Sequence, residues 1–295
     1  MLRPEHLSCE ARLQFKFFAP DFSTCHSLMP IKRLKSALYS ARLKRGRRIV
    51  PTTSFDALHD FFLMIQPVNT GKKLIRVGAA GDGGYLVPDD LDGIATCFSP
   101  GVSTVADFEL TLANRGIKSF LIDYSVSSAP VTHPLIEFER KFLGLTNDEI
   151  FVRLDDWVKA KAPDSNDLLL QMDIEGAEYD VLFDVSEETL KKFRMLIIEF
   201  HHLDNLMLAG DFKLFNLIFK KITKYFDVVH NHPNNCAPPY QYGSFEIPPI
   251  MELTFLRKDR VLSRTPATQF PHPLDHRNID EMEDFPLPKC WYQLR

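Results

Sequence analysis

Short apolar runs that alternate with helical patterns are the feature of this sequence that most constrains its fold. The run Leu168–Met172 is rich in apolar residues and shows no polar alternation, which is typical of a strand covered on both faces. Strands that alternate with helices predict an α/β fold, a mostly parallel sheet with helices on both faces. The expected strands span residues 74–77, 94–98, 118–122, 150–154, 168–172, 195–200, 226–229 and 251–256.

Helices are expected between these strands. Thr104 is placed to cap a helix over residues 105–114, and Gly116 ends it. A second helical pattern includes Leu214, Leu217, Ile218 and Ile222. The inner face of the first helix is expected to consist of Val105, Phe108 and Leu112.

The chain divides into three parts by composition. Of its 295 residues, 45% are hydrophobic and 25% charged, which is enough apolar material for a sizeable core. We expect a basic N-terminal extension over residues 1–50 and a main domain over 51–260. A C-terminal arm over 261–295 holds five of the 20 prolines. This arm is expected to pack on the domain, because its aromatic residues, Trp291 among them, need apolar cover.

The N-terminal part is strongly basic, although the whole chain has a net charge of −4. Eight Lys and Arg residues and no acid lie between Phe22 and Phe55. This segment is expected to be a basic helix on the main domain. A transit peptide, or a contact with a membrane surface or a partner through residues 31–48, remains an alternative. Its deletion is expected to spare cofactor binding. Met29 is an alternative start of the chain.

The cysteine content and the hydropathy bear on the compartment. The five cysteines are scattered, odd in number and without a C-x-x-C pair, so reduced thiols in the cytoplasm are expected. An organelle is the alternative if the basic segment is a transit peptide. Neither a secretory signal nor an apolar stretch of membrane-spanning length is visible. The acidic net charge argues against a nucleic-acid partner.

Polar clusters follow five of the expected strands, and the carboxyl ends of parallel strands form the usual ligand site of such a sheet. Asp123, after residues 118–122, suits the hydroxyls of a ribose. The preceding turn has Ser99, Pro100 and Gly101 in place of a glycine-rich phosphate loop. A nucleoside cofactor without phosphate is therefore favoured, S-adenosylmethionine over NAD.

Carboxylates and imidazoles supply the expected catalytic groups. Asp173, Glu175 and Glu178 lie within six residues, and Glu175 and Glu178 would share a face of a helix start. His201 is a candidate base, with the three carboxylates as further catalytic groups. Ordinary helix-start acids are the structural alternative. We expect no resident metal; a hard ion held by Asp173, Glu175 and a histidine is the alternative. Groups expected to bind the substrate are His202, His232, Asn234 and Asn235.

The segment LLQMDIEGAEYDVL (169–182) resembles the FkbM-like methyltransferases, which are class I S-adenosylmethionine-dependent enzymes. Segments such as RVGAAGDGGYLVPDDL (76–91), LIDYS (121–125), LDDW (154–157) and IIEFHHL (197–203) resemble a subgroup with animal methyltransferase-like members. The resemblance implies a Rossmann-like, doubly wound sheet of seven strands whose last strand, 251–256, is antiparallel. It also implies cofactor contacts at Asp82, Gly83, Gly84, Tyr85, Ser99, Gly101, Asp123, Asp155 and Asp173.

These observations lead to one expected function and two alternatives. The expected function is transfer of a methyl group from S-adenosylmethionine to a hydroxyl oxygen of a sugar, a glycan or a small natural product. The first alternative is an NAD-dependent oxidoreductase on the same fold. The second is a non-catalytic glycan-binding or scaffold module.

Overall fold

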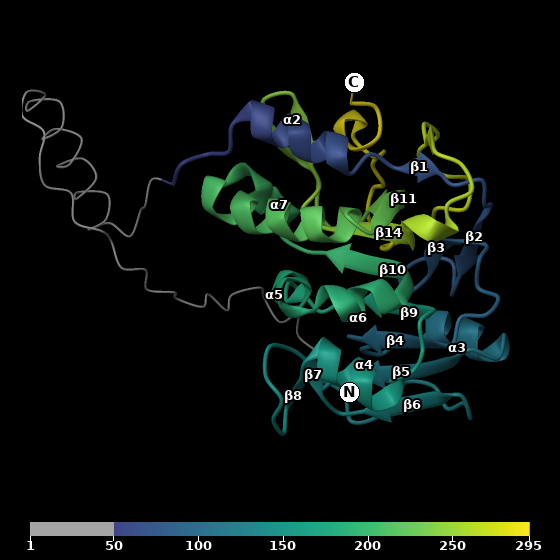
Figure 1. Ribbon diagram of the computed structural model, residues 1–295. Helices are drawn as coiled ribbons and strands as arrows, with labels where there is room; N and C mark the ends of the chain where they lie inside the picture. The colour runs from purple at the N-terminus through teal and green to yellow at the C-terminus, as the bar shows by residue number, and fades with distance from the viewer. Residues whose placement is uncertain (1–49, 295) are drawn as a thin grey trace, which may run out of the picture. The chain divides into compact units, whose positions relative to one another are not determined.

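The computed structural model describes residues 50–294, so the predicted basic segment and both of its alternatives lie outside the described residues (Figure 1). The centre is a seven-stranded sheet in the order β11-β14-β10-β9-β4-β5-β6. This confirms the predicted α/β class. The strands of this sheet are β4 (Thr96–Pro100), β5 (Lys118–Ile122), β6 (Ile136–Glu139), β9 (Leu168–Met172), β10 (Phe193–Phe200), β11 (Phe226–Pro233) and β14 (Met251–Arg257).

The direction of the strands agrees with the Rossmann-like expectation. β4 pairs in parallel with both β5 and β9, β5 with β6, and β9 with β10. Only β14 runs against its neighbours in this sheet, pairing antiparallel with β10 and β11. From β4 the chain builds β5 and β6 on one side and β9 and β10 on the other. The order of the strands therefore reverses at β4, and a crevice is expected outside the carboxyl ends there.

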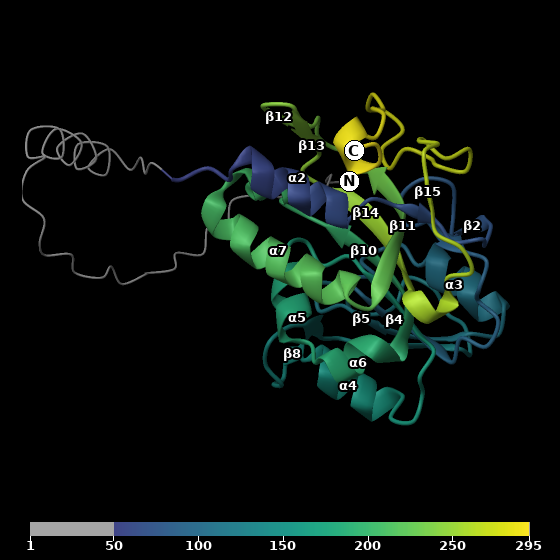
Figure 2. The ribbon, with the colours of Figure 1, turned by 45° about the horizontal axis from the view of Figure 1, so that its top comes forward.

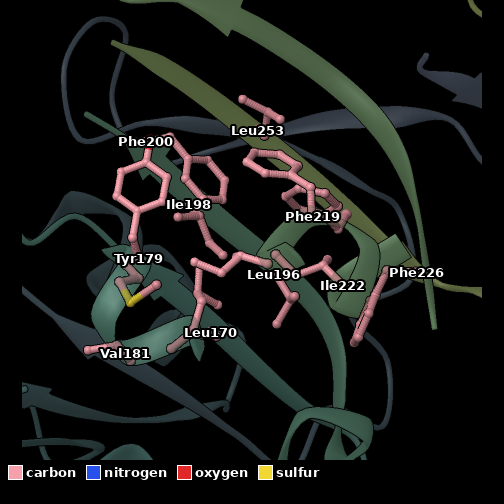
Figure 3. Packing of buried hydrophobic residues seen from close by; sticks show 14 of the residues in the cluster. Leu170, Tyr179, Val181, Leu196, Ile198, Phe200, Phe219, Ile222, Phe226 and Leu253 are labelled. Atoms are coloured by element: carbon pink, nitrogen blue, oxygen red, sulfur yellow. The ribbon is translucent and has the colours of Figure 1, made fainter. Parts of the chain in front are cut away.

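One face of the sheet carries most of the helices. Side chains from helices and strands point toward one another in this layer (Figure 3). Tyr179 and Phe219 come from two helices, and Phe200 and Leu253 from two strands of the sheet. The large apolar area removed from water here makes this layer the main core of the described residues. The helices of this face are α2 (Phe55–Met64), α4 (Leu154–Lys161), α5 (Glu178–Asp184), α6 (Glu187–Lys192) and α7 (Ala209–Thr223).

The opposite face is covered differently from the prediction. One helix, α3 (Asp107–Asn114), and a hairpin of β2 (Leu74–Val77) and β3 (Tyr85–Pro88) pack against it. Residues 74–77 thus form a strand, as predicted, but outside the central sheet. Figure 2 shows α3 and β2 near each other and α2 alongside α7.

Several predicted elements are corrected. One edge strand of the sheet is β6, which was not predicted, whereas residues 150–154 contribute only β8 (Phe151–Val152), paired with β7 (Phe142–Leu143). β11 runs to Pro233, four residues farther than predicted. The remaining short elements are β1 (Val68–Asn69) with β15 (Thr265–Pro266), β12 (Tyr240–Tyr242) with β13 (Phe245–Ile247), and the 3-10 turns Leu203–Met207, Lys258–Arg260 and Lys289–Trp291.

The start of α3 also differs from the prediction. The N-cap residue is Ala106, with no side-chain capping bond, so Thr104 does not cap this helix. Phe108 and Leu112 are buried as predicted, but Val105 lies before the helix and is exposed. The chain approaches α3 through a turn at residues 101–105 that lines a cavity, and this turn displaces the helix start.

Residues 261–294 lie against the α/β core. Trp291 is fully buried, its ring contacts Phe62 edge-on, and its Nε1 donates to the carbonyl of Glu246 at 3.1 Å. His230 pairs with Asp275 of the arm at 2.8 Å. The arm thereby covers the end of the sheet formed by β11 and β14. Within residues 50–294, the helices are all too short or too polar to cross a membrane.

Candidate functional site

Four strand ends converge where the strand order reverses. Gly101 follows β4, Asp123 follows β5, Asp173 follows β9 and His201 follows β10. These are four of the predicted site residues, and the parallel register of the strands brings them to one edge of the sheet.

Gly101 allows two of these strand ends to touch. Its φ is +87°, and a Cβ atom built on it would lie 1.6 Å from the carbonyl oxygen of Asp173. Its N–H donates to the carbonyl of Ile122 at 2.9 Å. Only glycine fits both the left-handed backbone and this close approach. The turn after β4 is therefore pressed against the end of β9.

Asp123 is buried at the end of β5 and held by the surrounding loops. One carboxylate oxygen accepts from the backbone N–H of Ser103 at 2.8 Å, and the other accepts from the N–H and the hydroxyl of Ser125 at 2.8 and 2.6 Å. Ser103 has a φ of +46°, an uncommon conformation for a residue with a side chain. These bonds fix the carboxylate in orientation and leave acceptor capacity toward the cleft.

A cleft of about 510 Å³ opens beside Asp123. One wall is apolar and aromatic, formed by Phe142 and Phe151, whose ring centroids lie 6.0 Å apart, with Leu143 and Ile122. Asp82, Asp173 and Glu175 also line the cleft. The sequence reading missed Ser103, Ser125, Phe142 and Phe151. Because β7 and β8 have two residues each, they carry no periodic pattern by which they could have been found.

A smaller cavity of about 110 Å³ adjoins this cleft and shares Asp82, Gly101 and Asp173 with it. Gly83 and Tyr85 of the β2–β3 hairpin also line it, so the structure brings these predicted residues to the site. The Tyr85 hydroxyl accepts from Gln171 Nε2 at 3.2 Å, and burial raises the pKa of this phenol well above its usual value. Tyr85 is therefore a neutral hydrogen-bonding group.

The loop DIEGAE forms around the carboxylate of Glu178. Its Oε1 accepts from the N–H groups of Ile174 and Gly176 at 3.0 and 3.1 Å and lies 3.2 Å from Nδ1 of His201. The side chain of Glu178 is 0% exposed. An ionised carboxylate accepts the Nδ1 proton, which leaves the lone pair of the neutral imidazole on Nε2. Glu178 orients His201 from beneath the loop.

Nε2 of His201 faces three further carboxylates. It lies 3.9 Å from Asp173 Oδ1, 3.9 Å from Glu199 Oε1 and 3.6 Å from Glu175 Oε2. Glu199, in the buried strand β10, was not among the predicted site residues. Its signal in the sequence is a charged residue inside the apolar run of that strand. We call Asp173, Glu175, Glu178, Glu199 and His201 the carboxylate–imidazole cluster.

The crowding of this cluster changes its protonation. Burial and the neighbouring carboxylates raise the pKa of Asp173 from 3.8 to about 7, although His201 acts in the opposite direction. Burial also raises the pKa of Glu199 well above its ordinary value. Burial alone would lower the pKa of His201, but the hydrogen bond and charge of Glu178 outweigh it and raise that pKa. The cluster can thus exchange protons near neutral pH.

The prediction that Glu175 and Glu178 share a helical face is wrong. Glu175 has a φ of +57° and lies in the loop before α5, whereas Glu178 is the first residue of the helix. The side chain of Glu175 is consequently in solvent, 88% exposed, whereas that of Glu178 is buried. His202 also has a φ of +57° and is exposed, with its ring next to Gly176.

Three of the four residues predicted to bind substrate are engaged within the protein. Asn234 donates to Glu199 Oε1 at 3.0 Å and so borders the cluster. His232, on β11 rather than in a loop, pairs with Glu252 at 3.2 Å. Asn235 donates to the carbonyls of Ile279 and Met282 in the C-terminal arm. Of these three, Asn234 is the one in contact with the cluster.

Three predicted cofactor contacts lie apart from the cleft. Ser99 is fully buried in β4, where its hydroxyl bonds with Glu109 and Gln171. Gly84 packs inside the hairpin turn, where a Cβ would lie 2.0 Å from the carbonyl oxygen of Ala79. Asp155 accepts from the N–H and the hydroxyl of Ser186, the N-cap residue of α6. These side chains support the elements around the site.

Comparison with known proteins supports the resemblance for part of the chain. Residues 139–224 match the methyltransferase FkbM domain. This segment includes the DIEGAE loop and His201, so the resemblance to FkbM-like methyltransferases is confirmed there. The match leaves out the turn after β4 and Asp123. No curated protein matches the chain in sequence.

Three solved structures match the chain at low similarity. A fibrillarin/Nop5p complex matches at 9% identity and a TM-score of 0.34, covering 56% of this chain and 73% of that chain. A Thermoplasma acidophilum protein matches at 9% identity and a TM-score of 0.32, covering 55% of this chain and 78% of that chain. The third match is an Anabaena variabilis protein described as a putative methyltransferase from an antibiotic biosynthesis pathway. It has 13% identity and a TM-score of 0.26, and the match covers 50% of this chain and 61% of that chain. These values are too low to support an inference about function.

Proposed function

We propose that this protein is an S-adenosylmethionine-dependent methyltransferase that acts on a hydroxyl oxygen of a small molecule or glycan. The observation that carries the proposal is that Asp123, Phe142 and Phe151 line the same cleft as Asp173 and Glu175 of the carboxylate–imidazole cluster. The match of residues 139–224 to a methyltransferase domain supports the reaction class.

The residues around the cleft fit the cofactor. Asp123 would accept the ribose hydroxyls, and the rings of Phe142 and Phe151 offer an apolar wall for the adenine. Asp82 and Asp173 line both adjoining cavities and would hold the cationic end. When bound, S-adenosylmethionine supplies an electrophilic methyl group at its sulfonium.

The cluster provides the proton acceptor that a hydroxyl substrate needs. Glu175 lines the cleft, and its Oε2 lies 3.6 Å from Nε2 of His201, so either group can take the hydroxyl proton. Glu178 fixes the imidazole orientation, which keeps the accepting nitrogen in place.

The structure gives a physical argument against the NAD alternative. A dinucleotide needs a helix N-terminus that can hold its pyrophosphate. The first turn of α3, the helix that follows β4, contains Asp107 and Glu109. Their carboxylates oppose a bound phosphate by charge, whereas a nucleoside without phosphate avoids this repulsion.

Equilibrium binding of labelled S-adenosylmethionine tests the proposal. The full chain should bind one cofactor per chain, and Asp123→Asn should weaken binding by about tenfold or more, since a charge-assisted hydrogen bond to the ligand is worth roughly 1.5–3 kcal/mol. Asp155→Asn is the matched control, because Asp155 bonds to Ser186 outside the cleft. It should bind the cofactor as the unaltered chain does.

Absence of binding at millimolar cofactor would contradict the proposal. Energy transfer to added NADH that Asp123→Asn removes would instead favour the oxidoreductase. A methyl-transfer screen over glycans and small hydroxylated metabolites then identifies the acceptor. Methylation of nitrogen or carbon alone in that screen would contradict the oxygen assignment.

A further inference from the structure

We infer that Asp173, Glu199 and His201 form a binding site for one divalent cation. One donor atom from each residue can be chosen so that all three lie within 4.8 Å of one another. Two donors on one ion lie no farther apart than twice the bond length, about 4 to 5 Å. The three side chains come from the ends of the adjacent strands β9 and β10, so the sheet itself holds their spacing.

The distances fit an ion better than direct bonds. Nε2 of His201 is 3.9 Å from both Asp173 Oδ1 and Glu199 Oε1, which is too long for hydrogen bonds. Nε2 and one oxygen of each carboxylate are nonetheless close enough for one ion to bind all three. Carboxylates crowded this closely repel one another when they are ionised, and a cation between them would remove the repulsion.

Buried oxygen atoms without partners are the second, independent observation. In the carboxylate–imidazole cluster, Asp173 Oδ1, Glu178 Oε2 and Glu199 Oε2 are buried without a hydrogen-bond partner. The Glu199 side chain is 5% exposed. An unsatisfied buried carboxylate oxygen is costly, and such groups normally reach a donor, a water or a metal. Two of these three oxygens belong to two of the three candidate ligands, which indicates a bound cation.

The surrounding residues resemble the outer shell of a metal site. Nδ1 of His201 bonds to Glu178, and a metal-binding histidine usually gives its other N–H to a carboxylate or carbonyl. Asn234 donates to Glu199 Oε1 at 3.0 Å and orients that carboxylate. Both contacts leave Nε2 of His201 and Oε2 of Glu199 free to bind an ion.

The ligand set indicates the class of ion. Two carboxylates and one imidazole suit a first-row divalent ion such as Mn²⁺, Fe²⁺ or Zn²⁺, whereas Mg²⁺ and Ca²⁺ prefer oxygen ligands alone. Three protein ligands leave coordination positions open. This step rests on the proposed function: the open coordination positions would take hydroxyl oxygens of the methyl acceptor. With His201 Nε2 on the ion, Glu175 is the group left to take the hydroxyl proton.

A titration of the untagged full chain with Mn²⁺ tests the site. Binding is measured as the loss of the electron paramagnetic resonance signal of free Mn²⁺. One Mn²⁺ per chain should bind saturably, and Zn²⁺ should displace it. Glu199→Gln and His201→Gln should each weaken binding at least tenfold. Glu246→Gln, an exposed glutamate on β13, is the matched control and should leave binding unchanged.

Equal Mn²⁺ affinity in the unaltered chain and in Glu199→Gln would overturn the inference, as would the absence of saturable binding at 1 mM Mn²⁺, roughly the weak end of protein sites for divalent ions. Glu199→Gln keeps the shape of the side chain, so thermal unfolding should confirm that the variant folds. The result is separate from the proposed function, because Mn²⁺ binding is measured without cofactor and cofactor binding without Mn²⁺.

Discussion

Residues of the same type take different roles in this protein because burial and backbone conformation differ. Glu175 and Glu178 are three positions apart, yet one is exposed and the other is sealed beneath a loop. The buried carboxylate accepts two backbone N–H groups and orients His201. Spacing along the chain alone could not separate these roles, since the left-handed backbone of Glu175 breaks the helical register.

Asp155→Ala tests the distinction between support and ligand contact at the residue scale. The variant loses the bonds to the N–H and the hydroxyl of Ser186, at 3.1 and 3.0 Å. We expect a loss of about 1–2 kcal/mol in the free energy of unfolding, measured by urea denaturation, from the lost hydrogen bonds. Cofactor affinity should stay unchanged. A tenfold loss of affinity in a stable variant would return Asp155 to the cofactor site.

The turn after β4 is the element on which the site depends most. Gly101 brings it against the end of β9, so Gly101→Ala combines a strained φ with a collision at 1.6 Å. We expect destabilisation of roughly 3 kcal/mol or more and a loss of cofactor binding. Denaturation curves and labelled-cofactor titration measure the two effects.

Gly116→Ala is the matched control for this turn. Gly116 has a φ of +85°, close to the +87° of Gly101, but a Cβ there meets no atom within 4 Å. The free energy of unfolding should fall by about 1–2 kcal/mol, from the strained backbone alone, and cofactor binding should be unchanged. Equal losses in the two variants would show that the contact with Asp173 has no part in the effect.

Across the whole molecule, Asp90 joins distant parts of the chain. Arg260, after β14, donates two hydrogen bonds to its carboxylate at 2.8 and 2.7 Å, and Lys72, before β2, donates a third at 3.0 Å. Burial alone would raise the pKa of Asp90, but these bonds outweigh it and lower that pKa below 3.8. The ionised form therefore stabilises the folded chain.

The contribution of Asp90 should depend on pH in one direction. Since its pKa is lower in the folded than in the unfolded chain, its stabilisation is full above about pH 4 and is lost as the pH falls through the lowered pKa. Asp90→Asn should lower the free energy of unfolding by roughly 1.5–3 kcal/mol at pH 7. The difference from the unaltered chain should shrink below pH 4 in denaturation series. A difference that grows toward acid would contradict this assignment.

The sequence alone determined the fold class and the composition of the strand ends. Buried strands in a parallel sheet are near-continuous apolar runs, so 118–122 and 168–172 were predicted with the observed bounds. Parallel strands end at the same edge, which correctly brought together Gly101, Asp123, Asp173 and His201. These features follow from local patterns, and local patterns are visible in a sequence.

Tertiary structure decided what local patterns cannot encode. Phe142 and Phe151 became a cleft wall through a pairing of two-residue strands, and Glu199 joined the cluster because β10 lies beside β9. Ser99 and Asp155 had suitable chemistry and neighbouring positions, but burial and hydrogen bonds direct them into the scaffold. The physical reason is that side-chain direction and burial depend on residues far away in the sequence, which only the packed chain brings into contact.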